Sequence, residues 1–433
     1  MFVVLSVWYY NCMLDIRFIR ENADLIREAT RKKHILFNVD ALLSVDQQRL
    51  QLQGDVEALR AEQNKASEEL GDLNQDSTVR EQTLERMKGV KEQLQKKEEE
   101  VKGIMVQWQQ LMLHVPNIPD ISVPEGEDDS GNKEVKVWGE KTQFTFAPKD
   151  HIELMTQHDM LDLERGAKVS GFRGYFLKND GVRLSLAIWQ CALDHFTAKG
   201  MSPMIVPSLV KREHLLGTGF IPQGENDLYK TQDGEYLAGT AEVATMGYYM
   251  NEVLDKASLP QKMLSFSPCF RREAGSHGRD MKGLIRVHEF YKWEQVVLCE
   301  ASHEESIRQH EWLTKNSEEF MELLELPYHT VVNCGGDLGL GQVKKYDIEL
   351  WVPLEQTYRE IGSASYFHDF QARRLNIRYR DDDGKLKYVH SLNTTAIPTP
   401  RILVSLVENY QQADGTVRVP QALVRYFGKE VIG

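Results

Sequence analysis

One segment near the middle of the chain combines residue types that suit chemistry on an anion. We interpret it as a strand over residues 266–273, a glycine-rich charged loop over 274–283 and a strand over 284–294. Each strand carries an arginine, Arg271 or Arg286, and a planar guanidinium group suits phosphate oxygens bidentately. Phe290 lies four residues beyond Arg286, so we expect it on the same face of its strand, where it could stack on a base. A surface hairpin with solvated arginines explains the spacing alone equally well.

Several common catalytic motifs are absent from the sequence. There is no GxxxxGK[ST] phosphate loop and no GxGxxG after a predicted strand. Each His-Glu pair lacks the second histidine of the HExxH zinc motif, because its place is taken by Lys292, Ile307 or Thr314. We therefore expect no zinc and no P-loop or dinucleotide-binding domain.

Length and composition favour a two-domain globular protein. The chain has 433 residues, of which 41% are hydrophobic and 27% charged, and its net charge of −13 argues against sequence-independent binding to nucleic acid. A local basic stripe stays compatible with that charge. The five scattered cysteines form no CxxC pair, which favours free thiols in a reducing cytoplasm.

The first twelve residues are apolar and aromatic, yet too short for a signal peptide or a membrane span. A charged, amphipathic stretch opens at Met13. We expect Met13 to be the functional start and residues 1–12 to be a mis-assigned start or a disordered extension.

Residues 40–115 contain no proline, and their apolar residues recur about every 3.5 positions. This pattern predicts an antiparallel helical hairpin with about 30 to 35 residues per leg, about 50 Å long. Residues 71–77 interrupt it with turn-forming residues, and Ser77 is expected to cap the returning helix. A solvated coiled coil used for dimerisation is an alternative use of such an arm. The predicted seam consists of Leu42, Val45, Leu52, Val56, Leu59, Leu84, Met87, Val90, Leu94, Val101, Met105, Trp108, Leu111 and Met112.

Three prolines and a polar linker over 125–131 end the hairpin, and the pattern then changes. Short β-rich runs at 262–269, 285–298, 346–352 and 388–392 alternate with helical stretches at 184–198, 302–326 and 401–411. Strands flanked by a few helices predict an α+β domain with a mainly antiparallel sheet.

The segment 269–290 closely resembles motif 2 of class II aminoacyl-tRNA synthetases, and specifically that of the bacterial-type seryl-tRNA synthetases. The resemblance continues over residues 13–433. It includes the opening 13–22, Thr240-Ala241-Glu242, and the stretches 369–374 and 408–415. It implies a class II antiparallel-sheet catalytic domain at 123–433, preceded by a tRNA-binding helical arm at 13–122.

The family resemblance implies a serine–tRNA ligase. Such an enzyme activates L-serine with ATP to seryl-adenylate and transfers it to the 3′ end of tRNA(Ser), and usually also of tRNA(Sec). The implied enzyme is a cytoplasmic homodimer without membrane contact. The stretch 200–207, with Pro207, fits the interface motif of the class. A related ligase that charges a carrier protein, or a non-catalytic tRNA-binding paralogue, are the alternatives.

The resemblance also assigns roles to residues of the active site. Arg271 would contact the α-phosphate of ATP and the serine carboxylate, and Arg401 would pair with the γ-phosphate. Glu360 and Ser363 would hold Mg²⁺ against the phosphates. No general base is needed, since the serine carboxylate is itself the nucleophile. The implied catalytic residues are Arg271, Arg286, Glu360 and Arg401, and the ATP site adds Glu273, Val287, Phe290 and Ser363.

The implied serine pocket recognises the amino group and the hydroxyl of its ligand. Thr240 and Glu242 would lie near the amino group, while Glu294 would reach both groups. The full set is Thr240, Glu242, Arg271, Glu294, Asn393 and Thr395. Phosphate contacts to tRNA are expected from Lys65, Arg80, Lys88 and Lys91 in the half of the arm nearest its tip.

Two departures from the family pattern concern this site. Gly239 stands where a proline usually precedes Thr-Ala-Glu, and residues 393–401 replace a glycine-rich run. Thr395 keeps a hydroxyl where serine is usual, so we expect serine specificity to survive. The backbone contacts to ATP are the part that this change affects.

Overall fold

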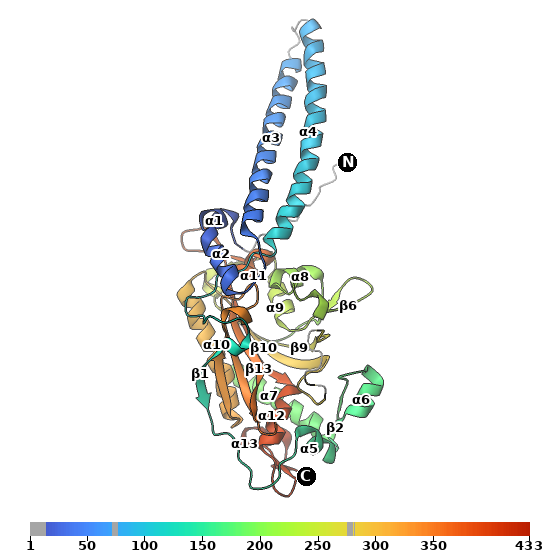
Figure 1. Ribbon diagram of the computed structural model, residues 1–433, viewed down its shortest axis with the longest axis vertical. Coiled ribbons are helices and arrows are strands. Elements are labelled where there is room, and N and C mark those ends of the chain that lie inside the picture. Colours follow the sequence, from blue (N-terminus) through green and yellow to red (C-terminus); the bar gives the residue numbers. More distant parts are fainter. Residues whose placement is uncertain (1–13, 72–76, 275–279, 281) are drawn as a thin grey trace. The chain divides into compact units, whose positions relative to one another are not determined.

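The computed structural model describes residues 14–71, 77–274, 280 and 282–433. The chain separates into two compact units (Figure 1). One comprises the chain up to Thr30 and the stretch Leu36–Pro116, and the other comprises Arg31–Ile35 and Asn117–Gly433. The expectation for residues 1–12 lies outside the described residues. No helix in the described part of the chain is long and apolar enough to cross a membrane.

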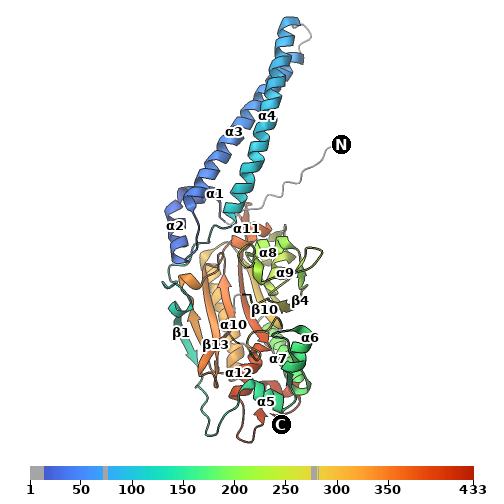
Figure 2. The same cartoon turned by 45° about the vertical axis from the view of Figure 1, so that its right-hand side comes forward.

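Two long helices dominate the first unit and confirm the expected hairpin. They run side by side in both ribbon views (Figures 1 and 2) and have 33 and 36 residues. The turn between them lies outside the described residues. Ser77, expected as the cap, is the first residue of the second helix. The helices of this unit are α1 Ile16–Glu21, α2 Ala23–Lys32, α3 Val39–Gly71 and α4 Ser77–Met112.

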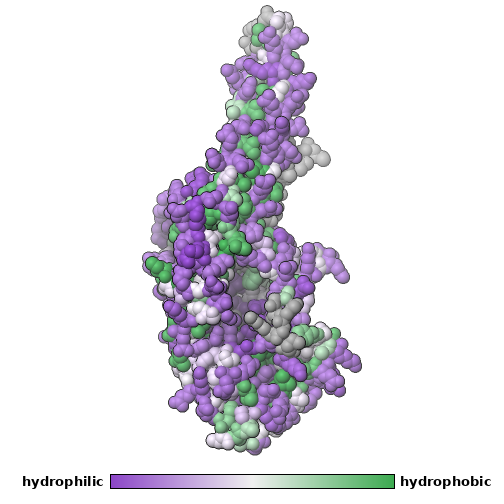
Figure 3. Space-filling model, in the orientation of Figure 1, coloured by the Kyte–Doolittle hydropathy of each residue, from purple (hydrophilic) through white to green (hydrophobic). Residues whose placement is uncertain are grey.

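The seam between α3 and α4 follows the predicted spacing with one exception. Leu42, Val56, Val90 and Leu94 are buried as expected. Leu84 was expected in the seam, but its side chain is 53% exposed. The reason is helical phase, because Thr83, seven residues before Val90, takes the buried position and its neighbour lies about 100° around the helix. The rest of the visible arm surface is mostly hydrophilic (Figure 3).

An eight-stranded sheet organises the second unit and confirms the α+β class. Its described neighbours pair antiparallel, except for β4, which lies parallel to β9 at one edge. In sheet order the strands are β1 Lys133–Trp138, β11 Tyr328–Val332, β12 Lys344–Val352, β13 Thr357–Tyr366, β16 His390–Thr399, β10 Glu289–Cys299, β9 Gln261–Phe270 and β4 Ser202–Ile205.

The two faces of this sheet differ in what covers them. One face packs on α7, α10 and α12 over the main hydrophobic core, and the other bears α8, α9 and α11 (Figures 1 and 2). The helices are α5 His151–Gln157, α6 Leu163–Ser170, α7 Asn179–Ala198, α8 Arg212–Thr218, α9 Glu242–Tyr248, α10 His303–Leu323, α11 Phe370–Leu375, α12 Arg401–Asn409 and α13 Gln421–Phe427.

Short strands complete the unit in small sheets at its periphery. These strands are β2 Leu161–Asp162, β3 Phe176–Leu177, β5 Leu209–Val210, β6 Tyr229–Lys230, β7 Tyr236–Leu237, β8 Val253–Asp255, β14 Arg378–Arg380, β15 Leu386–Tyr388, β17 Val417–Arg418 and β18 Val431–Ile432.

The expected hairpin strands at 266–273 and 284–294 are wrong at their inner ends. Strand β9 stops at Phe270 and β10 begins at Glu289, so Arg271 and Arg286 lie beyond the strands. The ladder ends because the backbone N–H of Arg272 donates to the carbonyl of Asp227 and not to the opposite strand. The argument that Phe290 shares a strand face with Arg286 is therefore also wrong. Residues 275–279 and 281 of the loop between the arginines lie outside the described residues.

Candidate active site

A cavity of about 370 Å³ opens on the sheet face that bears α8, α9 and α11. Figure 3 shows this unit hollowed, with mostly hydrophilic residues around the hollow. Arg286 is the one residue of the predicted site that is not among the described residues lining the cavity. The predicted residues that line it are Thr240, Glu242, Arg271, Glu273, Val287, Phe290, Glu294, Glu360, Ser363, Asn393, Thr395 and Arg401.

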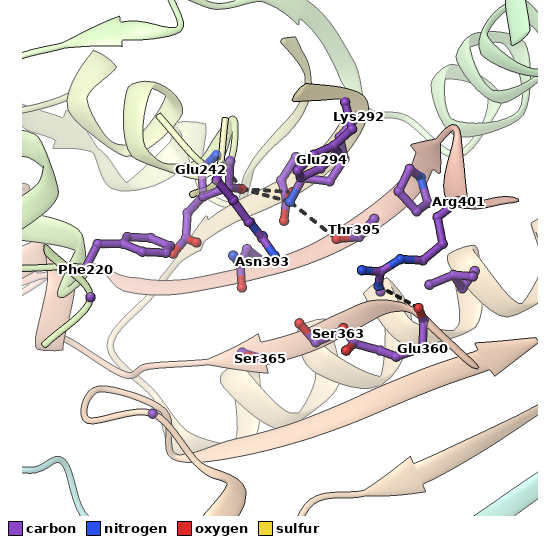
Figure 4. A pocket seen from close by; sticks show the side chains of 18 of the residues that line it. Phe220, Glu242, Lys292, Glu294, Glu360, Ser363, Ser365, Asn393, Thr395 and Arg401 are labelled. Atoms are coloured by element: carbon purple, nitrogen blue, oxygen red, sulfur yellow. Dashed lines mark hydrogen bonds and ion pairs between the residues drawn. The ribbon is translucent and has the colours of Figure 1, made fainter. Parts of the chain in front are cut away.

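A β-bulge in β13 brings Glu360 and Ser363 together. Residues three apart in a regular strand point to opposite faces. The register of β13 against β12 shifts by one residue at Ile361, since Gly362 pairs with Ile348 while Glu360 pairs with Glu349. The extra residue puts both side chains on one face, and both line the cavity (Figure 4).

A second bulge, in β16, supplies the opposite wall. Ile397 pairs with Trp293, whereas Thr395 pairs with Glu294, so Ala396 is the extra residue. Without it, Thr395 and Asn393 would share the core face with Ile397. With it, they face the cavity together with Glu294.

Close backbone approach completes this wall. A Cβ atom on Gly362 would lie 2.6 Å from the Cβ of Thr395. Contacts that short are not tolerated, so β13 needs a glycine beside Thr395. This position is therefore fixed by packing against the bulged strand.

Acidic groups and one lysine gather at one end of the cavity (Figure 4). Glu242, Lys292 and Glu294 are all buried. The ammonium group of Lys292 forms an ion pair with Glu294 and donates a hydrogen bond of 2.9 Å to Thr240 Oγ1. The alternation of β10 puts residues 292 and 294 on the same face. Sequence interpretation missed Lys292, although a lysine two residues before a carboxylate in a mostly apolar strand is a visible signal.

The hydroxyl of Thr240 has a full set of hydrogen-bond partners within the protein. It accepts from Lys292 Nζ and, at 3.3 Å, from the backbone N–H of Glu242, and it donates to Glu294 Oε2 at 3.2 Å. A hydroxyl has one hydrogen and two lone pairs, so this set uses all of them. Thr240 thus positions Glu294 through its side chain.

The Glu242 carboxyl is the group at this end with the most perturbed titration. Burial and the neighbouring Glu294 raise the pKa of Glu242 to about 7, against the lowering effect of hydrogen bonds from Gln371 and Asn393. Gln371 Nε2 donates to Glu242 at 2.6 Å and is itself held by Ser391. A cation bound here would favour the ionised carboxylate.

Arginines gather at the other end of the cavity. Arg271 Nε donates to the carbonyl of Gly239 at 3.2 Å, and its guanidinium carbon lies 5.3 Å from the centre of the Phe290 ring. A Cβ atom at residue 239 would come within 3.4 Å of Arg271 Cγ, so the glycine found there leaves this arginine room. One face of the Phe290 ring is therefore covered by Arg271.

Arg401 reaches the cavity from the first residue of α12. Its Nε donates to the carbonyl of Ile285 at 3.0 Å and its Nη1 to the carbonyl of Glu360 at 2.7 Å (Figure 4). Backbone carbonyls carry only partial charge, so the guanidinium keeps most of its charge for an anion. Pro400 lacks an N–H and stands immediately before this helix.

Arg286 is held beside the cavity by carboxylates. Its Nη1 lies 3.1 Å from Glu273 and its Nε 2.8 Å from Asp280. Asp280 also pairs with Arg359. A carboxylate between two guanidinium groups occupies the kind of position that a phosphate could take.

The loop over residues 339–342 forms another side of the cavity and rests on a buried lysine. Lys33 Nζ donates to the carbonyls of Gly339 at 3.1 Å, Leu340 at 2.9 Å and Gln342 at 2.6 Å. Burial lowers the pKa of Lys33 well below its usual value. Sequence interpretation missed this support, because Lys33 and the loop lie some 300 positions apart.

Comparison with known proteins adds the decisive information. Residues 13–119 match the family described as the seryl-tRNA synthetase N-terminal domain, and residues 229–410 match the class II core domain of the G, H, P, S and T synthetases. A serine–tRNA ligase of Deinococcus radiodurans is 46% identical over 423 residues, covering 97% of this chain and 99% of that one. This chain belongs to the seryl-tRNA synthetase family. A second serine–tRNA ligase, from Petrotoga mobilis, is 42% identical over 445 residues, 97% of this chain and 100% of its own.

Solved structures agree with membership of the seryl-tRNA synthetase family. The seryl-tRNA synthetase of Pyrococcus horikoshii, solved with ATP, matches with a TM-score of 0.91 and 38% identity over 97% of this chain and 99% of that one. A prolyl-tRNA synthetase of Giardia lamblia shares the fold alone, with a TM-score of 0.56 and 15% identity over 65% of this chain and 57% of its own. The resemblance inferred from sequence is thus confirmed.

Proposed function

We propose that this protein is a serine–tRNA ligase that activates L-serine with ATP and transfers it to the 3′ end of tRNA(Ser). The observation that carries the proposal is one cavity with two chemically different ends, in a chain of the seryl-tRNA synthetase family. The end with Glu242 and Glu294 suits an ammonium group and a hydroxyl. The end with Arg271 and Arg401 suits a polyphosphate.

Catalysis in this arrangement depends on positioning and charge neutralisation. The serine carboxylate attacks the α-phosphorus of ATP and pyrophosphate leaves, so no protein base has to remove a proton. Arg271 lines the cavity at its arginine end, where it would neutralise charge on both the carboxylate and the α-phosphate. Arg401 binds the leaving phosphates at the start of α12.

The protein groups present at Glu360 and Ser363 fit a magnesium ion that arrives with ATP. Mg²⁺ prefers oxygen ligands and takes one or two from the protein, the rest coming from phosphate and water. The bulge puts one carboxylate and one hydroxyl on the same face beside Arg401. No group of three or more His, Cys, Asp or Glu side chains suited to a metal occurs in the described part of the chain. When bound, the ion would neutralise phosphate charge.

We assign tRNA binding to the arm of residues 13–122 and catalysis to residues 123–433. Lys65, Arg80, Lys88 and Lys91 are exposed and form no ion pair with a described residue. Neighbouring Arg86, by contrast, pairs with Glu69. Uncompensated cations on a long helical pair suit the phosphates of an RNA helix. We propose tRNA(Sec) as a second tRNA that the same arm binds.

We also propose that the protein acts as a homodimer in the cytoplasm. Phe176, Val182 and Leu186 are more than 40% exposed and line one cleft of about 620 Å³. Edge strand β4 presents Ile205, which is 85% exposed. Such apolar surface beside an open sheet edge suits contact with a second copy of the chain. The four described cysteines are buried free thiols, which suits a reducing compartment.

Serine-dependent exchange of pyrophosphate into ATP tests the first step, and charging of tRNA(Ser) and tRNA(Sec) transcripts tests the second. We expect exchange with serine and not with alanine. Exchange followed by transfer to a carrier protein would favour the alternative ligase, and no exchange by a folded dimer would favour the non-catalytic paralogue.

Replacing Lys65, Arg80, Lys88 and Lys91 by serine should spare exchange and weaken tRNA binding. In this variant, the steepness with which log K for tRNA binding decreases against log salt concentration should be lower by up to about 3 to 4.

Variants of paired arm residues serve as controls, and a variant at the proposed dimer surface tests the oligomeric state. Replacing Arg60, Arg86 and Lys97, which pair with acidic partners, should change tRNA binding much less. Leu186→Glu should give a monomer in analytical ultracentrifugation, because a charge would be buried at the interface. Loss of exchange on shortening the arm would contradict the assigned division of roles.

A further inference from the structure

Lys292 occupies a position that the proposed chemistry does not use. Its side chain is 6% exposed, and its ammonium group lies among Thr240, Glu294 and Thr395 (Figure 4). These partners come from three different segments, namely the turn before α9, strand β10 and strand β16. A buried charge is costly unless it is paired and hydrogen-bonded. Here every N–H of the ammonium has a partner.

The ammonium fixes which atoms of Glu294 remain for a ligand. Lys292 Nζ forms its ion pair with Oε2 of Glu294, and Thr240 donates to the same oxygen. Oxygen Oε1 of Glu294 accepts no hydrogen bond from a described residue and belongs to a residue that lines the cavity. A carboxylate held in this way presents its other oxygen as an acceptor.

The same ammonium also orients the hydroxyl of Thr395. Lys292 Nζ donates to Thr395 Oγ1 at 3.4 Å, so a lone pair of that oxygen faces the lysine. The hydroxyl hydrogen must then point elsewhere, and it has no acceptor among the described residues. Since Thr395 lines the cavity, its hydrogen is available to a ligand oxygen.

We propose that Lys292 is a positioning residue that makes the pocket present one acceptor, on Glu294, and one donor, on Thr395, to the hydroxyl of serine. This inference rests on the proposed function. A hydroxyl both donates and accepts, so it satisfies both groups at once. A methyl group satisfies neither and leaves two buried polar groups unpaired, which is how a polar site rejects an analogue that lacks the hydroxyl.

Lys292→Met keeps the length of the side chain and removes its charge. Serine-dependent pyrophosphate exchange should then show a KM for serine raised by about 10- to 100-fold, the effect of losing hydrogen bonds to a charged group. The kcat at saturating serine and the KM for ATP should change by less than about threefold, because Lys292 contacts neither the nucleotide end nor the reacting atoms. The preference for serine over alanine should fall in parallel.

Rescue by a conservative variant separates positioning from a merely structural role. The charged and titratable groups around Glu294 are Lys292 on β10, Glu242 on α9, and Cys269 and Arg271 at the end of β9, while β16 contributes the neutral Asn393 and Thr395. Among the described residues, the ammonium group of Lys292 is the cation that pairs with Glu294. The KM for serine of Lys292→Met should therefore exceed the wild-type value at every pH between 7 and 9, with kcat little changed. Lys292→Arg, which keeps the charge, should restore the wild-type KM.

Two further variants keep the test decisive if Lys292→Met folds poorly. Lys292→Met/Glu294→Gln removes both members of the buried ion pair, so it should fold and accept alanine nearly as well as serine. Lys136→Met breaks another lysine–glutamate contact, with Glu318 at 2.8 Å, on the far side of the sheet, and should leave the KM for serine unchanged. A wild-type KM for serine and selectivity in Lys292→Met would overturn the inference alone. No serine-dependent exchange by the wild-type protein would overturn the proposed function and the inference with it.

Discussion

The two ends of the cavity differ in the partners of their charged side chains. At the serine end, Glu242 and Glu294 are buried and answered by side chains of the same pocket, such as Lys292 and Gln371. At the nucleotide end, by contrast, Arg271 and Arg401 donate to backbone carbonyls.

The difference follows from the size and charge of the two ligands. A small zwitterion offers few atoms for contact, so the pocket must be organised before it binds. A triphosphate brings several charges of its own, and arginines bonded only to carbonyl oxygens keep their charge available for it. The serine end is therefore expected to be sensitive to geometry and the nucleotide end to charge.

The largest effect is expected at Arg271. Arg271→Ala should reduce kcat for pyrophosphate exchange by about 10³-fold or more, because charge on the carboxylate and the α-phosphate is no longer neutralised. The melting temperature should change little. Arg272→Ala is the matched control, since Arg272 donates to the carbonyl of Asn226 and is not among the described residues that line the cavity. Equal losses in both variants would contradict the shared role of Arg271.

A second prediction concerns charge at the serine end. The raised pKa of Glu242, about 7, means that its carboxyl group takes up a proton as the pH falls below 7 and no longer attracts the serine ammonium. The KM for serine should therefore rise as the pH falls from 8 to 6. Glu242→Gln should raise this KM about 100-fold and remove the pH dependence.

The same variant should have the opposite effect on stability. A carboxyl group whose pKa is higher in the folded protein than in the unfolded chain costs stability once the pH exceeds the unfolded value. Glu242→Gln should therefore melt at the same or a higher temperature at pH 8. A clear loss of stability would show that the carboxylate serves folding as well as binding.

A third prediction tests geometry at the serine end. Gly362→Ala adds a methyl group 2.6 Å from the Cβ of Thr395 and must displace that residue. We expect the KM for serine to rise about 10-fold with little change in the KM for ATP. Gly89→Ala, where the added atom meets nothing within 4 Å, should leave both constants unchanged. A shift confined to ATP would mean that the bulged wall serves the nucleotide.

The smallest effect is expected beside the nucleotide end. Asp280→Ala removes the carboxylate that pairs with Arg286 and Arg359, and it should lower the KM for ATP by about two- to fivefold, since that carboxylate no longer competes with phosphate for the two guanidinium groups. Asp382→Ala, which breaks an exposed pair with Lys256 at 2.5 Å, serves as the control. A raised KM for ATP would show instead that Asp280 organises the nucleotide site.

The sequence predicted the antiparallel sheet and the helical arm, because these depend on composition and on hydrophobic period. Through the family resemblance it also named twelve of the residues that line the cavity. It could not predict the ends of β9 and β10, because the bond from Arg272 to Asp227 joins distant segments. Lys292 and Lys33 were missed because their partners lie on other strands and loops.

The single extra residues at Ile361 and Ala396 have a consequence for comparing or redesigning such pockets. Each extra residue reverses the alternation of side chains between the two faces of its strand. On one side of it the odd-numbered residues face the cavity, and on the other side the even-numbered residues do. An alignment gap moved by one residue would exchange pocket and core positions without changing the number of matched residues. Transferring this cavity to another sheet thus requires copying both extra residues together with the side chains, because deleting either one would turn pocket side chains toward the core.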